Sequence, residues 1–304
     1  MQTNSGDSGG GPRVCALTGG SGYVGSRLAA ALQRAGWEVV HWTRRVGPAG
    51  RTVSFRLGEE VEAAKLAGVE ALIHCAYDFG LHRWRDIHAV NVVGSERLLA
   101  AARQAQVRRI ICISTISAFP GCRALYGRAK LAMERAAQSV GAVIIRPGLV
   151  YGERPGGVFG KLLEQARSAR VVPLIRGGLQ TQYLLHEDDL ATVILRCLEE
   201  SFVPPTEPIT VAHEQGWELR DILTQLAAAQ NRRLRFVPVP WQLVWVALKS
   251  LELLGLRPPF RSDSLISMVY QNPRPDFTLA RSLGFRCRPF TVTPQMVGVS
   301  GAGR

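Results

Sequence analysis

A glycine-rich turn near the start of the chain constrains the fold more than any other feature. The apolar run Val14–Leu17 leads into glycines spaced G-x-x-G-x-x-G, and a helical pattern follows. In such a strand–turn–helix unit the glycines permit a tight turn, close approach of a pyrophosphate and close helix–strand packing. Amide groups at the helix start then attract the anion. The residues predicted to bind a dinucleotide here are Gly19, Ser21, Gly22, Tyr23, Val24 and Gly25.

Length and composition indicate a globular α/β protein. With 304 residues, 46% hydrophobic and 20% charged, the chain can hold one large domain or a domain with a smaller lobe. Its six cysteines form no C-x-x-C pair, and Cys15, Cys75 and Cys112 lie in apolar runs, as expected for reduced thiols in a cytoplasmic protein. Residues 1–12 are polar and glycine-rich, and we expect a disordered leader rather than a signal peptide.

The formal charge of +13 comes mainly from arginines spread along the chain. No nucleic-acid-binding module is recognisable, so we expect no nucleic-acid partner. A basic surface suits an anionic cofactor, an anionic substrate or an anionic membrane, and it also fits a general basic bias of composition.

The end of the second expected strand, Trp37–Trp42, bears on cofactor choice. An NAD site places an acidic residue there to bind the ribose hydroxyl. This chain has Thr43, Arg44 and Arg45 instead. Guanidinium groups can grip a 2′-phosphate in bidentate fashion, which favours NADP(H) over NAD(H). A solvated basic turn is the alternative.

Further strands and helices alternate up to residue 150. Ala71–Ala76 and Arg109–Ile113 read as buried parallel strands, and Asp86–Gln104 reads as the long helix between them. His74 lies inside the first of these strands, and we interpret it as a core histidine. Cys75 and Ala76 end the same strand and are expected to line the cofactor site.

Tyr126 and Lys130 stand four residues apart at the start of an expected helix, Ala129–Ser139. This spacing puts the phenol and the ammonium on one helix face. A neighbouring ammonium stabilises the phenolate and is expected to lower the pKa of the tyrosine. Tyr126 is therefore the predicted acid/base, and Lys130 its activator and a ribose ligand.

These motifs resemble the short-chain dehydrogenase/reductases in their extended, epimerase/dehydratase-like form, over about Arg13 to Phe290. The segments that carry the resemblance are TGGSGYVG at 18–25, NVVG at 91–94, IST at 113–115, YGRAK at 126–130, RPGLVYG at 146–152, HEDDLA at 186–191 and SLGF at 282–285. The resemblance implies that Pro147 lines the nicotinamide and that a Ser or Thr polarises the substrate oxygen.

The sequence departs from that family pattern in two places. Ser114, Thr115 and Ser117 lie much closer to Tyr126 than the family's hydroxyl does, and Ile116 stands at the usual hydroxyl position. We expect Ser117, or otherwise Thr115, to fill the role. The arginine–aspartate pair that sugar-nucleotide enzymes use on a diphosphate is not evident near residues 268–276.

Residues 151–304 are expected to form a small α/β substrate lobe, some of whose strands and helices return to the dinucleotide-binding domain of residues 13–150. His186, Asp188 and Asp189 read as helix-capping residues, and we expect no metal. The apolar segment 241–254 is too short to span a bilayer. It reads as a core helix of the lobe, or, by resemblance to the 3β-hydroxysteroid dehydrogenase-like branch, as a helix over the substrate or on a membrane surface. A homodimer is also compatible with the sequence.

Three functions remain open at this point. The favoured one is an NADP(H)-dependent oxidoreductase that moves a hydride between the nicotinamide and a secondary alcohol or ketone of a small molecule. The second is a sugar-nucleotide epimerase or dehydratase that retains its cofactor. The third is a cofactor-bound protein without turnover, with a structural or regulatory role. In each case the fold is a doubly wound parallel sheet with the cleft at the switch in strand order.

Overall fold

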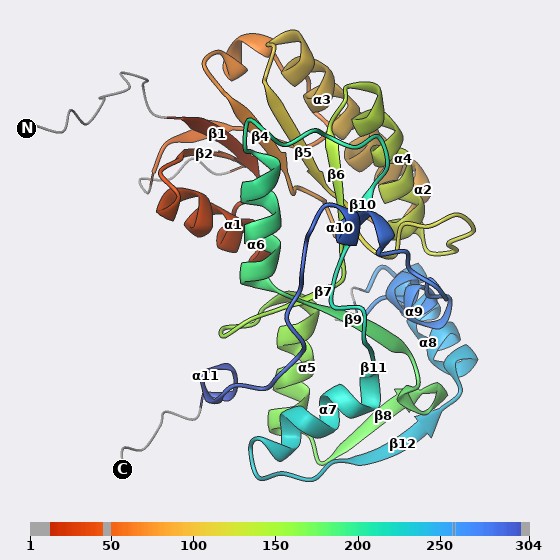
Figure 1. Ribbon diagram of the computed structural model, residues 1–304. Coiled ribbons are helices and arrows are strands. Elements are labelled where there is room, and N and C mark those ends of the chain that lie inside the picture. The colour runs from red at the N-terminus through yellow and green to blue at the C-terminus, as the bar shows by residue number, and fades with distance from the viewer. Residues whose placement is uncertain (1–12, 45–49, 257, 259, 299–304) are drawn as a thin grey trace, which may run out of the picture.

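The computed structural model describes residues 13–44, 50–256, 258 and 260–298. Arg45 and the expected leader, residues 1–12, lie outside the described residues. Figure 1 shows a large sheet with helices on both faces in the upper half, and a smaller lobe below it to which α5, α7, α8 and β12 belong.

The large sheet has seven strands in the order β10-β6-β5-β4-β1-β2-β3, and every pairing is parallel. Its strands are β1 (Val14–Thr18), β2 (Glu38–Thr43), β3 (Thr52–Ser54), β4 (Ala71–His74), β5 (Arg109–Ile113), β6 (Val143–Pro147) and β10 (Ile209–Val211). The central strands are apolar throughout because helices cover both faces. The strand order reverses between β1 and β4, where a parallel sheet offers its ligand crevice. The predicted doubly wound parallel fold is confirmed.

Helices from distant parts of the chain cover the two faces. One face packs against α1 (Tyr23–Arg34), α6 (Glu187–Cys197) and α10 (Thr278–Ser282). The other packs against α3 (Gly94–Gln104), α4 (Leu125–Ser139) and a short 3₁₀ turn, η1 (Ala63–Leu66). Because β10, α6 and α10 come from the second half of the chain, that half contributes to both parts of the molecule.

The helix expected over Asp86–Gln104 is three segments. A short α2 (Trp84–Ile87) leads into a π-helical stretch, η2 (His88–Val93), and then into α3. Such π-bulges are common at functional sites. The bulge carries Asn91, whose buried amide holds the loop after β4: Asn91 Oδ1 accepts from the Asp78 amide at 2.6 Å, and Asn91 Nδ2 donates to the Asp78 carbonyl at 3.2 Å.

The smaller lobe contains two further sheets. The sheet order β7-β9-β11 joins β7 (Leu149–Tyr151), β9 (Thr181–His186) and β11 (Gly216–Glu218), and a parallel pair joins β8 (Val171–Ile175) to β12 (Arg235–Val239). The remaining elements are α5 (Gly157–Ser168), η3 (Arg176–Gly178), α7 (Leu219–Ala228), α8 (Trp241–Leu253), α9 (Ser262–Val269) and α11 (Pro294–Val297). Phe159, Leu226 and Phe290 belong to a separate core under these elements.

The interpretation of residues 241–254 as a core helix is wrong. Helix α8 forms as expected, but none of its residues, all of which the structure describes, is buried. No helix among the described residues is long and apolar enough to span a membrane.

Candidate active site

In the glycine-rich turn of residues 19–25, which we call the glycine cradle, backbone packs so closely on backbone that side chains do not fit. Gly19 has a φ of +71°, and a Cβ on it would lie 2.8 Å from the Ala76 backbone nitrogen. A Cβ on Gly25 would collide with the Gly19 carbonyl oxygen. Helix α1 starts here without an acidic residue in its first turn, and no described side chain caps it. The amide groups and the helix dipole at this end are therefore suited to a pyrophosphate.

A buried hydrogen-bond chain holds the ends of β1 and β4 together. Thr18 Oγ1 accepts from the amides of Cys75 and Ala76, both at 3.2 Å, and lies 2.7 Å from His74 Nδ1. His74 Nε2 lies 2.8 Å from Ser95 Oγ, whose proton goes to the Asn91 carbonyl. The chain is consistent when neutral His74 carries its proton on Nε2 and accepts from Thr18. Burial and the charge of Lys130 lower the pKa of His74 to about 3. His74 is a core histidine, as predicted.

Among the other residues of the glycine motif, some are exposed at the turn, while Tyr23 points toward α6. Ser21 and Gly22 are exposed at the turn, and Val24 is half-buried. The Tyr23 hydroxyl instead donates to Glu187 Oε2 at 2.6 Å, and Arg27 pairs with the same carboxylate at 3.1 Å. Burial raises the pKa of Tyr23. Tyr23 therefore ties the turn to the start of α6.

Strand β2 ends at Thr43, and the exposed Arg44 follows it directly. Sequence reasoning missed His41 on the same strand. Its Nδ1 lies 2.6 Å from where a Cβ on Gly20 would stand, so the imidazole forms a wall beside the glycine turn.

Tyr126 and Lys130 lie on α4, which begins at Leu125, one turn earlier than expected. The Lys130 ammonium is buried and donates to the Ile113 carbonyl at 2.8 Å. Burial raises the pKa of Tyr126 to about 12, and a hydrogen bond from Thr115 opposes that shift. The prediction that Lys130 lowers this pKa is wrong for this structure, because burial dominates and the ammonium is held by Ile113.

Thr115, rather than the favoured Ser117, faces the phenol. Thr115 Oγ1 accepts a hydrogen bond from the Ser117 amide at 3.2 Å, which leaves the threonine proton to donate toward Tyr126. Ser117 contributes its backbone to this turn, and among the described contacts its hydroxyl makes no hydrogen bond. The sequence could not distinguish the two residues because a three-residue turn decides which hydroxyl points inward.

The Ser114 hydroxyl forms a hydrogen bond with a buried ion pair, Glu134–Arg146. It donates to Glu134 Oε1, and Arg146 donates to both carboxylate oxygens of Glu134 at 2.8 and 2.6 Å. Tyr126, Lys130 and Glu134 thus lie on one face of α4. They form hydrogen bonds with Thr115, the Ile113 carbonyl and Ser114, respectively. The Ser114 side chain therefore binds a residue of α4 and not the backbone of its own loop.

Two aromatic rings that the sequence did not single out line Tyr126. The ring of Tyr77 meets that of Tyr126 edge-on at a centroid distance of 5.0 Å, and Phe79 lies at 5.5 Å. Lys130 Nζ lies 5.3 Å from the centre of the Tyr77 ring. Phe79 is 60% exposed, so it stands at the mouth of the site.

The lobe also reaches α4 through Asp263 and Arg261. Asp263 accepts from the amides of Leu125 and Tyr126 at 2.6 and 3.1 Å. Arg261 donates to the carbonyls of Phe79 and Leu81, both at 2.6 Å. Sequence patterns gave no signal for these contacts because the residues lie far apart in the chain.

Pro147 ends β6, and its carbonyl accepts from the Ile116 amide at 3.0 Å, which brings it beside the Thr115 turn. His186 caps α6 by accepting from the Asp188 amide at 3.2 Å, and Asp189 pairs with Arg288 at 2.7 Å. Within the described residues, no three His, Cys, Asp or Glu side chains are grouped as metal ligands.

Residues 15–212, well over half of the chain, match the family of NAD dependent epimerases and dehydratases. The chain belongs to the NAD-dependent epimerase/dehydratase family. It is an NAD(P)-dependent enzyme of the extended short-chain dehydrogenase/reductase type, as the motifs implied.

Several similar proteins are reductases. This epimerase/dehydratase-family chain is 26% identical over 286 residues to a 4-hydroxy-2-methyl-3-oxo-4-farnesyl-3,4-dihydroquinoline-1-oxide ketoreductase of Stigmatella aurantiaca, covering 84% of this chain and 85% of the relative. It is 27% identical over 239 residues to the ceramide reductase of Caulobacter vibrioides, covering 75% and 74%. The NAD-dependent NDP-hexosamine 5,6-dehydratase TunA shares the fold, with a TM-score of 0.69 at 19% identity over 94% of this chain and 96% of TunA.

The family's dinucleotide fits the residues present. The Gly19–Gly25 cradle would hold the pyrophosphate, Lys130 would hold a ribose hydroxyl, and Pro147 would face the nicotinamide. The start of α1, which has neither a side-chain cap nor an acidic residue in its first turn, is the observation that supports this fit.

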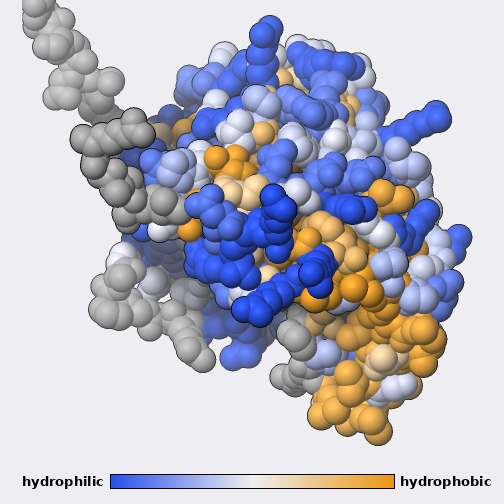
Figure 2. All heavy atoms as spheres, turned by 90° about the horizontal axis from the view of Figure 1, so that it is seen from below, coloured by the Kyte–Doolittle hydropathy of each residue, from blue (hydrophilic) through white to orange (hydrophobic). Residues whose placement is uncertain are grey.

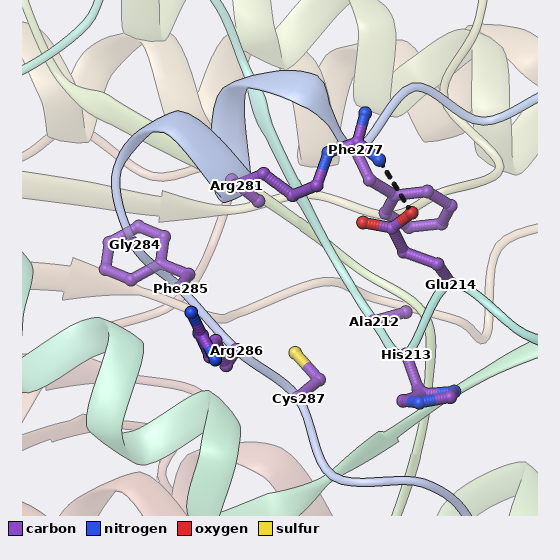
Figure 3. A pocket seen from close by; sticks show the side chains of 10 residues that line it. Ala212, His213, Glu214, Phe277, Arg281, Gly284, Phe285, Arg286 and Cys287 are labelled. Carbon is purple, nitrogen blue, oxygen red and sulfur yellow. Dashed lines mark hydrogen bonds and ion pairs between the residues drawn. The ribbon is translucent and has the colours of Figure 1, made fainter.

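A hollow of about 490 Å³ lies between α10 and the loop after β10 of this enzyme (Figure 3). Arg281 pairs across it with Glu214 at 3.0 Å, and Phe277 and Phe285 belong to the core cluster that includes α6. Because Tyr126 lies on α4 at the other face, we assign no part of the reaction to this hollow.

Proposed function

We propose that this enzyme is an NADP(H)-dependent oxidoreductase that transfers a hydride between the nicotinamide and a secondary alcohol or ketone. The observation that carries the proposal is the arrangement of Tyr126, Thr115 and Lys130 beside the glycine cradle. A phenol and a hydroxyl that face each other can both bond one substrate oxygen, and a bound nicotinamide supplies or accepts the hydride.

In the reductive direction Tyr126 acts as the acid. With a pKa near 12, the phenol is protonated at neutral pH and can give its proton to the carbonyl oxygen as the alcohol forms. The Thr115 hydroxyl donates a second hydrogen bond to that oxygen as negative charge develops. The Lys130 ammonium, which donates to the Ile113 carbonyl, has further N–H groups with which to bind a ribose hydroxyl of the cofactor.

We further propose that the substrate is lipophilic. Tyr77 and Phe79 offer aromatic faces beside the phenol. A cavity of about 130 Å³ lies at the first turn of α4, where Leu125, Trp245 and Ile266 line it together with six polar or charged residues. The relatives named for a farnesyl quinoline oxide and for ceramide, both lipophilic molecules, support the same class.

For the cofactor, we propose a preference for NADP(H), held by Arg44 and Arg45 at the end of β2. The exposed guanidinium of Arg44 directly follows Thr43, and no acidic residue stands at the strand end to bind a free ribose hydroxyl. Arg45, which lies outside the described residues, is the next residue in the sequence.

A sugar-nucleotide epimerase or dehydratase with retained cofactor is the second candidate. Solved structures with this fold include a UDP-N-acetylglucosamine 4-epimerase from Bacillus cereus, with a TM-score of 0.62 at 19% identity, covering 84% of this chain and 96% of that one. An epimerase leaves no net change in NADPH.

The test is an NADPH-oxidation assay on a panel of lipophilic ketones, run beside UDP-sugars. Net NADPH consumption with a ketone supports the oxidoreductase. Interconversion of UDP-sugars without added cofactor, and no oxidation with any ketone, supports the second candidate and contradicts the first.

A further inference from the structure

Two opposite charges are buried one turn apart on α4. Figure 2 shows hydrophilic side chains over much of the lower face of the molecule, which fits a formal charge of +13. Among the described residues, only Lys130, Glu134 and Asp189 combine a formal charge with burial, at 3%, 3% and 8% exposed. A buried charge is unfavourable unless it is paired and hydrogen bonded. The proposed reaction uses the Lys130 ammonium, whereas it does not use the Glu134 carboxylate.

Glu134 joins the ends of two neighbouring strands to α4. Its Oε1 atom accepts hydrogen bonds from the Ser114 hydroxyl and from Arg146 Nε, the latter at 2.8 Å, and its Oε2 atom accepts from Arg146 Nη2 at 2.6 Å. Ser114 is the first residue after β5, and Arg146 is the last residue but one of β6. The two strands also bind each other here, because the Ser114 amide donates to the Ile145 carbonyl at 2.7 Å. One carboxylate therefore fixes the carboxyl ends of both strands.

The residues that follow these two contacts belong to the reaction site. Thr115, whose hydroxyl faces the Tyr126 phenol, comes directly after Ser114. Pro147, which we expect beside the nicotinamide, comes directly after Arg146. Displacement of either strand end would move one of these groups relative to the phenol. A misplacement of about 1 Å can lower a rate by about 10²-fold.

We propose that Glu134 is a positioning residue for the reaction. Through Ser114 it sets the place of the Thr115 hydroxyl, and through Arg146 it sets the place of Pro147. Its effect on turnover rests on the proposed function. Its effect on the neighbouring ammonium can be measured by cofactor binding without any substrate.

The Glu134 carboxylate acts on the ammonium of Lys130, which lies one turn earlier on α4. Burial lowers the pKa of Lys130, and three neighbouring groups oppose that shift: Cys112, Cys75 and Glu134. Burial raises the pKa of the two thiols to about 11 and about 12, respectively, so both are neutral near pH 8. Glu134 is the one of the three that is charged there, and it favours the protonated ammonium.

The other titratable groups around the ammonium are uncharged near pH 8, with one exception. Burial lowers the pKa of His74, at the end of β4, to about 3. Burial raises the pKa of Tyr77, in the loop after β4, and raises that of Tyr126 to about 12. Arg146 of β6 is charged, and it is paired with Glu134. Loss of the Glu134 charge would leave an unpaired guanidinium in the same region, which further disfavours the ammonium.

The test is titration with NADPH between pH 7 and about 9.5 without substrate, together with steady-state kinetics at saturating NADPH. The ammonium is present below the pKa of Lys130 and is lost as the pH rises through it. Glu134→Gln keeps the size of the side chain and removes its charge, so NADPH affinity should fall at a pH lower by about half a unit or more. The same variant should lower kcat by about tenfold or more, because both strand ends lose the carboxylate.

Ser114→Ala is a milder variant that leaves the Glu134–Arg146 pair intact. It should lower kcat several-fold, because the start of the Thr115 turn is released, and it should keep the native pH dependence of NADPH binding, because no charge changes. Glu70→Gln is the matched control. It removes the charge from another glutamate–arginine pair, with Arg13 at 3.2 Å, before the amino end of β4. It should match the native protein in both measurements.

Native kcat in Glu134→Gln, or a loss no larger than that of Glu70→Gln, would overturn the proposal. If Glu134→Gln does not fold, Ser114→Ala decides: native kcat would contradict the proposal, and a lower kcat with native NADPH affinity would support it. Failure of the proposed function has a different signature, since the native protein would then reduce no ketone. In that case NADPH binding decides, and an unchanged pH dependence in Glu134→Gln would overturn the proposal.

Discussion

Asp263 accepts a hydrogen bond from the backbone amide of Tyr126 at 3.1 Å, although 137 residues separate them in the chain. Its other oxygen accepts from the Leu125 amide, and the N-cap residue Ala124 has no side chain that could do so. A carboxylate at this position satisfies two free amides and meets the positive end of the helix dipole. Asp263 thus fixes the first turn of α4, on which the phenol stands.

We predict that Asp263→Ala lowers kcat by about tenfold or more while changing the KM of the cofactor little, since Tyr126 loses its fixed position. The cap itself contributes about 1 kcal/mol to stability. Asp276→Ala is the control: Asp276 caps α10 by accepting from the Thr278 amide at 2.8 Å, far from Tyr126. Asp263→Asn, which keeps one acceptor, should recover part of kcat. Equal kcat values for the two alanine variants would contradict the prediction, because Asp263 would then only stabilise the helix and would not position Tyr126 for the reaction.

We expect Tyr126→Phe to reduce turnover by about 10²–10⁴, the usual contribution of a positioned acid. Only a hydroxyl is lost, so NADPH affinity and the unfolding midpoint should stay close to native. Lys130→Met should lower both turnover and NADPH affinity, because the ammonium that would bind the ribose also holds the Ile113 carbonyl, next to the Thr115 turn. Isothermal titration with NADPH and steady-state kinetics separate the effects. Turnover by Tyr126→Phe within a few-fold of native would rule out the proposed acid.

Thr115→Val should cost about 10²–10³ in turnover, the usual loss when a donor to a developing oxyanion is removed. Thr115→Ser keeps the hydroxyl and should restore most of it. Ser117→Ala is the matched control and should change turnover only slightly, because the backbone amide of Ser117 contacts Thr115. The reverse ranking of the Thr115→Val and Ser117→Ala variants would assign the oxyanion bond to Ser117.

Replacing Arg44 by alanine should weaken NADPH binding at least tenfold and leave NADH binding almost unchanged. A well-formed charge-assisted hydrogen bond to a phosphate contributes roughly 1.5–3 kcal/mol. Arg56→Ala is the control, because Arg56 is exposed and paired with Glu59. Titration of each variant with both cofactors measures the difference. Parallel losses for NADPH and NADH, or tighter NADH binding by the native enzyme, would contradict the assignment.

His74 should make the protein less stable in acid. Its pKa is about 3 when folded, against an ordinary value of 6.5, so between these values the unfolded chain binds a proton that the folded chain does not. The stabilisation is complete above about pH 6.5 and is lost as the pH falls, by up to about 1.4 kcal/mol per pH unit. Urea unfolding of the native protein and of His74→Gln between pH 7 and 5 tests this. The native curve should fall more steeply; parallel curves would mean that His74 does not titrate on unfolding.

The sequence by itself determined the main sheet, and it singled out the glycine turn and the Tyr126–Lys130 pair as candidate site residues. Apolar runs gave β1 and β5 because parallel strands buried on both faces need continuous apolar residues. The glycines at 19 and 25 predicted the turn for the cofactor. Only glycine fits at these positions, because a Cβ atom on either residue would collide with nearby backbone atoms. The spacing of Tyr126 and Lys130 placed both groups on one helix face because a local helical period fixes it.

Only the tertiary structure decided the pKa of Tyr126 and which residues contact it. Burial raises the pKa of Tyr126, and burial depends on Tyr77 and Phe79 from the loop after β4. A turn of three residues, rather than spacing, turned Thr115 toward the phenol. Asp263 reaches α4, and α8 remains uncovered, through the packing of segments more than a hundred residues apart. Contacts of that kind leave no periodic trace in the sequence, because side chains that meet across the fold need only complementary chemistry, not a fixed spacing.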